Sequence, residues 1–373
     1  MRSLVVTAWF PDAETPSRTP FIVEHCWALQ DAGHDVAVVH VNIGRRTRTT
    51  EQEVYQRIPV TRVWLDVTDP RSYAHVTRVL SAGLHGADVL HTMAFSAVLL
   101  SAPAWAVRQL PWVHTEHWNG VVNPASVNPL WQRLAWLRHA LRLPHAVTGV
   151  TAELCTEMAR FSRPGATHVV PCIVENPHPA AEFPASPPLR LVGVGALIDR
   201  KRPVLALETV AELVRRGVDV HYTLVGKGPL MESLPQTARE LGIEDRVVLT
   251  GAVPPAEIAQ RLSDAHIFFL PSAQENFFTA VAEAIAAGRP AAVPLSGGFD
   301  DYCTPENSVL THSWDVPVLA DAIETARDRF READPAAIAA TVRSRFSRAE
   351  IGAQFSRLYR AVTRDASGRH ASR

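Results

Sequence analysis

The feature that most constrains the fold is a repeated alternation of short apolar runs and helical stretches. The first run, residues 4–9, is followed by apolar residues at helical spacing, by Gly33 and by a second apolar run at 36–39. Parallel strands need a crossover connection, which is usually a helix, so this order is typical of a parallel sheet. The sequence therefore predicts the α/β class.

The alternation occurs twice along the chain, in two halves separated by a proline-rich stretch. In the first half the expected strands are 4–9, 36–39, 60–65, 88–91, 112–115 and 147–150. In the second half the expected strands are 189–194, 220–225, 247–249, 267–270 and 291–294. The second half also has helical patterns at 204–216, 230–241, 256–263 and 279–287. Between the halves, residues 171–188 contain six prolines and no helical period, which is typical of a linker.

These patterns predict two doubly wound domains that face a central cleft. We expect the first domain at 1–175, the linker at 176–188 and the second domain at 189–345. Residues 346–373 are expected to form a closing helix, which packs back on the first domain, and a polar tail after Thr363. Ligands of open parallel sheets bind beyond the carboxyl ends of the strands, so functional residues are expected there.

Composition excludes several other classes of protein. No apolar run reaches the roughly 18 residues of a membrane span, and no cleavage region follows Met1, which predicts a cytoplasmic protein. The four cysteines are dispersed without a C-x-x-C pair, which argues against a disulfide framework or a zinc site. Charge is balanced, with 37 basic and 38 acidic residues, so nucleic acid is not an expected partner.

Two carboxylates stand close together after one strand of the second domain. Glu275 follows the strand at 267–270, and Glu283 lies about one turn into the next helix. A carboxylate can accept two hydrogen bonds from the vicinal diol of a sugar, and the amides at a helix start bind anions. The alternative is that Glu275 caps the helix and Glu283 is a solvated surface charge.

Lysine occurs at only two positions, Lys201 and Lys227, and both lie at predicted strand ends beside glycines. All other basic residues are arginine, so a retained lysine indicates a site that needs a compact cation, such as one under a phosphate oxygen. Chance retention is the alternative. Three successive cations, Arg200 to Arg202, follow Gly195 and suit a diphosphate.

The order of these motifs resembles the GT4 family of retaining, nucleotide-sugar-dependent glycosyltransferases with the GT-B fold. The matching motifs are G-x-L-x-x-x-K at 195–201, V-G-x-G-P at 225–229, L-T-G-x-V at 249–253, E-N-F-x(5)-E at 275–283 and G-G at 297–298. In the first domain, G-H-D-V at 33–36 and H-T-E-H-W-N-G at 114–120 are similar to that family's G-H-x-V and histidine loop. The resemblance implies two Rossmann-like domains, with the acceptor in the first and the nucleotide sugar in the second.

The resemblance also implies a role for each matched residue. The nucleoside would contact Glu283, Val253 and Lys227, and Glu283 would hold the ribose diol. The diphosphate would contact Gly195, Arg200 and Lys201. The donor sugar would contact Glu275, Asn276, Phe277 and Phe278, the last three through their amides. The acceptor would contact Arg18, Thr19 and Trp118. Catalysis would rest on His117, Lys201 and Glu275, with His117 near the reacting carbon.

Three positions depart from the family pattern. Ala196 stands where many relatives have a phosphate-binding arginine, so Arg200 or Arg202 would substitute. The segment from Arg18 to Pro20 replaces a glycine pair, and Pro20 has no amide to donate to a phosphate. Asp301 replaces a glutamate.

The predicted function is retaining transfer of a sugar from a nucleotide sugar, expected to be a UDP-sugar, to an acceptor hydroxyl. The expected acceptor is a natural product or a precursor of a cell-surface glycan. No D-x-D triplet occurs, so neither a metal nor another cofactor is expected. Two alternatives remain open, a nucleotide-sugar epimerase of the same fold and a non-catalytic sugar-nucleotide binding protein. A glycoside hydrolase is disfavoured because the glutamates lie beside cations and glycines, and a dehydrogenase because no G-x-G-x-x-G follows the first strand.

The segment 131–142 has two interpretations. It is amphipathic, and Arg133, Arg138 and Arg142 are the only formal charges between Glu116 and Glu153. Such a helix could make a weak peripheral contact with an anionic membrane. Alternatively, it packs its tryptophans on the first sheet like an ordinary helix.

Overall fold

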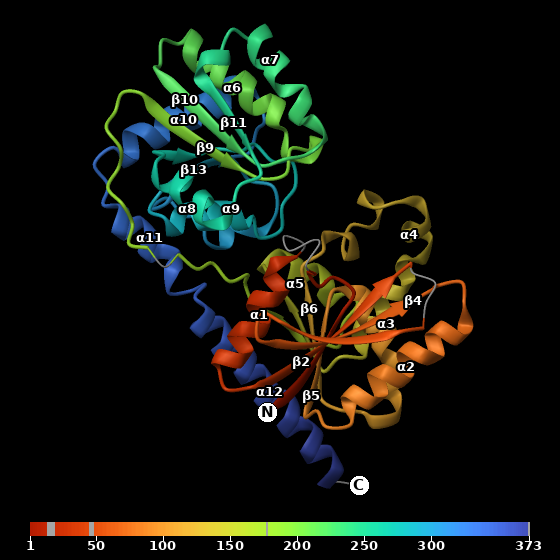
Figure 1. The fold of residues 1–373 in the computed structure, drawn as a ribbon. Helices are drawn as coiled ribbons and strands as arrows, with labels where there is room; N and C mark the ends of the chain where they lie inside the picture. Colours follow the sequence, from red (N-terminus) through yellow and green to blue (C-terminus); the bar gives the residue numbers. More distant parts are fainter. Residues whose placement is uncertain (13–18, 45–47, 177, 372–373) are drawn as a thin grey trace. The chain divides into compact units, whose positions relative to one another are not determined.

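The structure, a computed structural model, describes residues 1–12, 19–44, 48–176 and 178–371. The chain divides into two compact units, unit 1 with residues 1–173 and 347–373, and unit 2 with residues 174–346 (Figure 1). Each unit is built on one predominantly parallel sheet with helices between its strands. The predicted α/β class with two doubly wound sheets and a helix at the chain end is therefore confirmed.

The sheet of unit 1 has the strand order β3-β4-β2-β1-β5-β6-β7-β8 in the described residues. Its strands are β1 (Arg2–Thr7), β2 (Asp35–Ile43), β3 (Thr50–Tyr55), β4 (Ile58–Leu65), β5 (Val89–Met93), β6 (Trp112–Glu116), β7 (Ala146–Gly149) and β8 (Thr167–Val169). All neighbours pair in parallel except β3, which is antiparallel to β4. The order of connections reverses between β1 and β5, and ligands of such sheets bind beyond the strand ends near this point.

The helices of unit 1 are α1 (Pro20–Asp31), α2 (Pro70–Leu84), α3 (Phe95–Arg108), α4 (Pro129–Leu134), α5 (Ala152–Ala159) and α12 (Arg348–Ala371). The last of them, α12, packs against α1 and supplies Ile351, Phe355 and Tyr359 to the core around β1 and β2. At Gly352 a Cβ would lie 2.3 Å from the carbonyl oxygen of Ala28, so a larger residue there would separate the two helices. The closing helix is thus part of unit 1.

The sheet of unit 2 has the order β11-β10-β9-β12-β13-β14 in the described residues, with all pairs parallel. Its strands are β9 (Leu189–Val194), β10 (Val220–Val225), β11 (Val247–Gly251), β12 (Ile267–Phe268), β13 (Ala291–Pro294) and β14 (Ser308–Thr311). Its helices are α6 (Pro203–Arg215), α7 (Leu234–Glu240), α8 (Pro255–Ser263), α9 (Thr279–Ala286), α10 (Val316–Phe330) and α11 (Pro335–Arg343). Here the connections reverse between β9 and β12.

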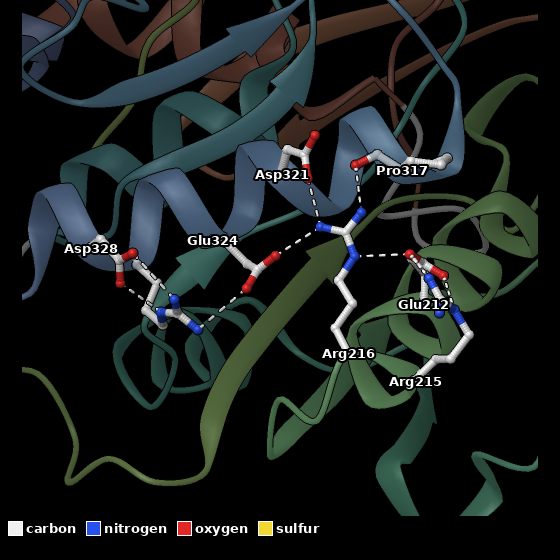
Figure 2. Close-up of polar contacts among 8 residues, drawn as sticks. Glu212, Arg215, Arg216, Pro317, Asp321, Glu324 and Asp328 are labelled. Atoms are coloured by element: carbon white, nitrogen blue, oxygen red, sulfur yellow. Dashed lines mark hydrogen bonds and ion pairs between the residues drawn. The ribbon is translucent and has the colours of Figure 1, made fainter.

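A polar network holds α6 against α10 in unit 2 (Figure 2). The guanidinium of Arg216, at the end of α6, donates to Glu212 at 2.8 Å, to Asp321 at 2.6 Å and to Glu324 at 2.8 Å. It also donates to the carbonyl of Pro317 at 3.2 Å. One cation therefore joins two helices, and the other end of α6 follows directly on the loop that carries Lys201.

Three segments differ from the local predictions. The helix expected at 230–241 is a 3-10 turn at Pro229–Glu232 followed by α7, because Pro235 fits only the first turn of a helix. The helix expected at 131–142 is α4 followed by a 3-10 helix over Ala135–Arg142. The polar tail expected after Thr363 continues α12 as far as Ala371.

Candidate functional site

In unit 2 the loops that follow β9 and β12 bring two cations and a carboxylate of the predicted site together. Lys201 forms an ion pair with the Oε1 atom of Glu275, and a guanidinium nitrogen of Arg200 lies 3.4 Å from the same oxygen. The hydroxyl of Ser272 also donates to this oxygen, at 2.5 Å. Since β9 and β12 flank the reversal of the sheet, the cluster lies where a ligand of this sheet is expected.

The Lys201–Glu275 pair is largely removed from solvent. The side chains of Lys201 and Glu275 are 12% and 9% exposed, whereas that of Arg200 is 46% exposed. Burial lowers the pKa of Lys201, and the charge of Glu275 and its hydrogen bond partly offset this effect. The Nζ atom of Lys201 also lies 4.5 Å from the ring centroid of Phe278. Polar ligand groups that reach this pair would meet charges poorly screened by water.

The loop that carries Glu275 is held by the strand end beside it. The N–H of Glu275 donates to the carbonyl of Ser296 at 2.7 Å. At Gly297, where φ is +125°, a Cβ would lie 1.7 Å from the carbonyl oxygen of Glu275. A glycine is therefore required at this point of the G-G motif, because it lets the two loops touch.

The side chains of Phe277 and Phe278 pack in the hydrophobic core of unit 2. Both rings are buried, Phe277 against Tyr302 and Phe278 against Phe268. The hydroxyl of Tyr302 donates to the carbonyls of both residues. Within the part of the chain that the structure describes, the N–H groups of Phe277 and Phe278 donate to no other residue. The backbone, and not the rings, is therefore the part of this loop that can bind a ligand.

Glu283 is a carboxylate on the first turns of α9. Its side chain is partly buried and makes no hydrogen bond or ion pair with another described residue. Burial raises the pKa of Glu283 to about 7. An unpaired carboxylate in this environment gains by accepting hydrogen bonds from a ligand. Its environment thus differs from that of a solvated surface charge.

The remaining predicted nucleoside residues lie on the neighbouring loops after β10 and β11. The side chain of Lys227 is exposed, and its carbonyl accepts the N–H of Leu197 at 3.0 Å, which joins the loops after β9 and β10. Val253 is partly buried after β11. Neither side chain makes a polar contact with Glu283 or Glu275 within the described residues, so the structure places these two positions at adjacent strand ends and not in the charged cluster.

Gly226 and Gly228, on the loop after β10, lie against the backbone of the loop after β9. A Cβ on Gly226 would lie 1.8 Å from the carbonyl oxygen of Gly195, and one on Gly228 would lie 2.4 Å from that of Leu197. Their first effect is therefore to let the loops after β9 and β10 pack together. At Gly195 a Cβ would meet side chains and not backbone, since it would lie 3.2 Å from the Cδ2 of Leu270 and 3.5 Å from the Cε of Lys201.

Arg200 and Arg202, either of which could replace the family arginine that is absent at Ala196, contact different neighbours. Arg200 joins the Glu275 cluster. Arg202 adopts φ of +49° at the start of α6, and its guanidinium lies 5.2 Å from the ring centroid of Trp314. Trp314 in turn donates to the carbonyl of Ser272 at 3.2 Å. Arg200 is thus the nearer of the two to the charged pair.

In unit 1 the histidine loop turns on a buried carboxylate. Glu116, the last residue of β6, is fully buried, and its Oε1 accepts the N–H groups of His117 and Trp118, both at 2.9 Å. The Oε2 atom lies 3.5 Å from the Nε2 of His114, which is also fully buried. Glu116 therefore fixes the backbone from which the side chain of His117 projects.

The ring of His117 lies against aromatic neighbours. Its centroid is 4.2 Å from that of Phe21, on the first turn of α1, and 5.1 Å from that of His25. Its Nδ1 lies 3.9 Å from the Sγ of Cys172. Burial, with smaller effects of His25, His114 and His91, holds the pKa of His117 well below its usual range. His117 is thus a neutral imidazole at physiological pH.

The predicted acceptor residues lie near the same loop. The hydroxyl of Thr19 donates to the carbonyl of Trp9 at 2.7 Å, and the rings of Trp9 and Trp118 are 5.9 Å apart. Trp9 therefore connects Thr19 to Trp118, a link that was not apparent from the sequence although Trp9 ends the first predicted strand. Phe21 was not apparent either, because helical spacing gave it only a core position. Arg18 lies outside the described residues.

Comparison with protein families finds two matches, one in each half of the chain. Residues 20–176 match the model described as "Glycosyltransferase Family 4". Residues 188–328 match the model described as "Glycosyl transferases group 1". The second match contains the Lys201, Glu275 and Glu283 positions, and the first contains the His117 loop.

Curated relatives cover parts of the chain. One is a component of phosphatidylinositol N-acetylglucosaminyltransferase from Arabidopsis thaliana, 25% identical over 75% of this chain and 59% of that protein. Another is 2-deoxystreptamine glucosyltransferase from Streptomyces kanamyceticus, 32% identical over 40% of this chain and 38% of that protein. The chain thus spans less than two thirds of the length of these relatives.

Solved structures resemble the whole chain in fold. The lipopolysaccharide outer core galactosyltransferase WaaB, in its apo form, has a TM-score of 0.75 and 15% identity, over 97% of this chain and 99% of that one. HepE from Anabaena, in complex with UDP, has a TM-score of 0.73 and 18% identity, over 97% of this chain and 100% of that one. At these identities the likeness concerns the fold alone.

Proposed function

Because this chain belongs to the GT4-type glycosyltransferases and has their GT-B fold, we propose that it transfers a sugar from a nucleotide sugar to an acceptor hydroxyl. Unit 2 binds the donor, and unit 1 supplies His117 and the contacts to the acceptor. Anomeric configuration is retained, no metal takes part, and the reaction takes place in the cytoplasm. The glycosyltransferase models favour transfer over the epimerase and non-catalytic alternatives.

The observation that carries this proposal is the cluster around Glu275. Lys201, Arg200 and Ser272 all meet one oxygen of this carboxylate, beside backbone N–H groups that have no described acceptor. A nucleotide sugar has the complementary groups, a diphosphate for the cations and sugar hydroxyls for the carboxylate. Both sets lie at the reversal point of the sheet, where a ligand can reach them together.

Donor binding would exchange partners within this cluster. The diphosphate takes the ammonium of Lys201 and the guanidinium of Arg200, which are then charge-assisted donors to phosphate oxygens. This frees Glu275 to accept hydroxyl hydrogen bonds from the sugar, and the N–H groups of Phe277 and Phe278 donate to the same sugar. The nucleoside contacts the backbone of Val253 and the exposed side chain of Lys227, and its ribose diol donates to Glu283.

Charge develops on the phosphate during transfer, and the cations are placed to stabilise it. The bond between the anomeric carbon and the β-phosphate oxygen breaks, and the acceptor oxygen forms a bond to that carbon on the same face. The acceptor proton passes to the departing phosphate oxygen. Lys201 and Arg200 stabilise the resulting nucleoside diphosphate, and fixed charges in a poorly hydrated site act strongly on such a transition state.

We propose a UDP-sugar as the donor. Structures of HepE in complex with UDP and with UDP-glucose support this choice by likeness of fold. The acceptor is a natural product or a precursor of a cell-surface glycan. Its hydroxyl is held on unit 1 near His117, Thr19 and Trp118, where neutral His117 acts by hydrogen bonding and not as a charge.

A panel of nucleoside diphosphates and nucleotide sugars, screened by thermal shift on the full chain, tests the donor. A ligand at 100 times its dissociation constant stabilises the folded state by about 2.7 kcal/mol, so UDP and one UDP-sugar should raise the melting temperature and ADP or GDP should not. Glu283→Gln should reduce the shift. If no nucleotide sugar stabilises the protein, the proposal is wrong, whereas stabilisation by another base would replace UDP only.

A further inference from the structure

The segment Val127–Arg142 of unit 1 exposes a concentrated set of large apolar side chains. Leu130 and Trp136 are 65% and 66% exposed, and Val127 and Leu134 are each 37% exposed. These four are among thirteen exposed large hydrophobic residues in the described chain, yet they fall within ten consecutive positions. Scattered exposed apolar residues are normal, but a gathering of this kind marks an interaction site.

The fold does not need these side chains, because other residues of the segment attach it to unit 1. Trp131 packs against Phe95 and Trp118 at ring distances of 5.6 and 5.8 Å, and its Nε1 donates to the carbonyl of Gly120 at 2.6 Å. The guanidinium of Arg138 lies 4.1 Å from the ring centroid of Phe161. The two tryptophans of the segment therefore differ, since Trp131 packs inward and Trp136 faces solvent.

The charge around this surface has one sign. Residues 117–152 contain three arginines and no lysine, aspartate or glutamate. The side chain of Arg138 packs on the ring of Phe161. Arg133 and Arg142 are exposed and form no ion pair within the described residues. Other exposed apolar residues have different surroundings, as Val54 shows, which is 73% exposed on β3 next to Glu53. Apolar exposure and unpaired positive charge thus coincide here.

We propose that the surface formed by Val127, Leu130, Arg133, Leu134, Trp136 and Arg142 binds an anionic lipid bilayer. Trp136 and the leucines would enter the boundary between headgroups and acyl chains, and the two arginines would contact lipid phosphates. An indole at this depth and cations near an anionic surface are both favourable. The segment lies on the membrane and does not cross it, and among the described residues no helix has the length and apolar character of a membrane span.

The position of this surface connects it to the proposed acceptor site, a step that rests on the proposed function. Trp131, on the inner side of the segment, stacks near Trp118, which directly follows His117. An acceptor carried by a lipid in the same bilayer would therefore reach unit 1 beside the histidine loop. The class of acceptor that this surface favours is a glycan precursor linked to a lipid and not a freely soluble natural product.

Vesicle flotation of the full chain tests the proposal, with phosphatidylglycerol–phosphatidylcholine vesicles compared with pure phosphatidylcholine. The protein should float with the anionic vesicles, and high salt should weaken binding. Trp136→Ala should reduce the partition coefficient about tenfold. Arg133→Gln with Arg142→Gln should reduce it by about fivefold for each arginine. Val54→Ala is the matched control and should bind as the unchanged protein does.

The surface variants are expected to have the circular dichroism spectrum and the melting temperature of the unchanged protein, which shows that they fold. Equal binding to neutral and anionic vesicles, or a partition coefficient for anionic vesicles that Trp136→Ala leaves unchanged, would overturn the proposal. So would sedimentation that shows a dimer abolished by Trp136→Ala without vesicle binding, because the surface would then join two copies of the chain. Vesicle binding does not require turnover, so its loss in a protein active on soluble acceptors affects this inference and leaves the proposed function intact.

Discussion

The loop after β12 in unit 2 and the loop after β6 in unit 1 are built alike but differ in charge. Each follows a buried parallel strand and carries a predicted site residue. In unit 2 the Glu275 loop meets two cations, and Glu283, on the helix that follows, forms no ion pair among the residues that the structure describes. In unit 1 the ring of His117 lies beside the rings of Phe21 and His25, and the buried carboxylate of Glu116 binds only the backbone of its loop.

The comparison shows that burial acts in the same way in both units, but that unit 2 adds opposite charges beside one another, as in the pair of Lys201 and Glu275. Burial disfavours the charged form of any group, so it raises the pKa of Glu283 and lowers those of His25, His91 and His117. Unit 2 therefore has groups that gain from a charged, polar ligand. In unit 1 the rings beside His117 are neutral, which suits an uncharged acceptor hydroxyl.

The largest expected effect comes from Lys201, the cation that the loop after β9 brings to Glu275. Lys201→Ala should lower kcat about a hundred- to a thousandfold, more than it weakens donor binding, because charge on the leaving phosphate grows in the transition state. Lys201→Arg should also be impaired, since a planar guanidinium does not replace a compact ammonium. Steady-state kinetics with the identified donor measures both.

Arg202→Ala is the matched control for this prediction, since Arg202 lies over Trp314 and not on Glu275. It should lower kcat far less than Lys201→Ala does. If Lys201→Arg retains full activity, the argument from the scarcity of lysine is wrong.

The next effect concerns the neutral loop and the stability of unit 1 in acid. The pKa of His25 is lowered to about 4 by burial, from 6.5, so the unfolded chain takes up its proton first as the pH falls. His25 then costs unit 1 about 3 kcal/mol of unfolding free energy between pH 6.5 and pH 4, stability that is fully present above pH 6.5. His25→Phe should remove this part of the acid sensitivity.

Hydrogen exchange of peptides from β5 and β6, at a series of pH values and corrected for intrinsic rates, measures the stability of unit 1. Removal of His221, which is exposed on β10 of unit 2, is the control and should leave these peptides unchanged. An equal acid sensitivity in the His25→Phe protein would show that the buried histidines do not set the stability of this unit.

A smaller effect is expected for the unpaired carboxylate. In the proposed function the ionised form of Glu283 accepts hydrogen bonds from the ribose diol. Because burial raises the pKa of Glu283 to about 7, UDP affinity should increase as the pH rises from about 6 to about 8. Glu283→Gln should weaken UDP binding roughly ten- to hundredfold at about pH 8 and flatten this dependence. Calorimetric titration with UDP measures both changes.

For the unliganded protein the sign is reversed. A raised pKa means that the folded state holds the proton more tightly, so the contribution of Glu283 to stability is present below pH 4.5 and is lost as the pH rises through 7. Glu208→Gln, on the exposed side of α6, is the matched control. Unchanged UDP affinity in Glu283→Gln would remove Glu283 from the nucleoside site.

The smallest effect is expected from chelation. In the proposed function Arg200 and Lys201 neutralise the diphosphate without a metal, so dialysis against EDTA should leave product formation unchanged. Addition of Mg²⁺ or Mn²⁺ afterwards should not raise it. Nearly complete loss of activity that metal restores would contradict the roles of both Lys201 and Glu275.

Much of the fold was predictable because buried parallel strands are nearly continuous apolar runs. The strands β3, β8 and β14 were not predicted, and the same rule explains the first of them. β3 has the sequence TEQEVY and pairs antiparallel at the edge of the sheet, where most of its side chains are exposed. Short polar edge strands of this kind carry no apolar signal, so their pairing is visible only in the structure.

The positions of the candidate site residues follow from the sequence, because the order of strands places Lys201, Glu275 and Glu283 at strand ends or just beyond them. The sequence did not determine their interactions. The ion pair joins residues 74 positions apart, and the glycine that holds Glu275 lies on a different loop. Likewise, the sequence does not distinguish Trp131 from Trp136. The structure shows that Trp131 packs on Trp118 and that Trp136 is exposed. The physical reason is that charge pairing and desolvation depend on neighbours in space, and those neighbours come from distant parts of the chain.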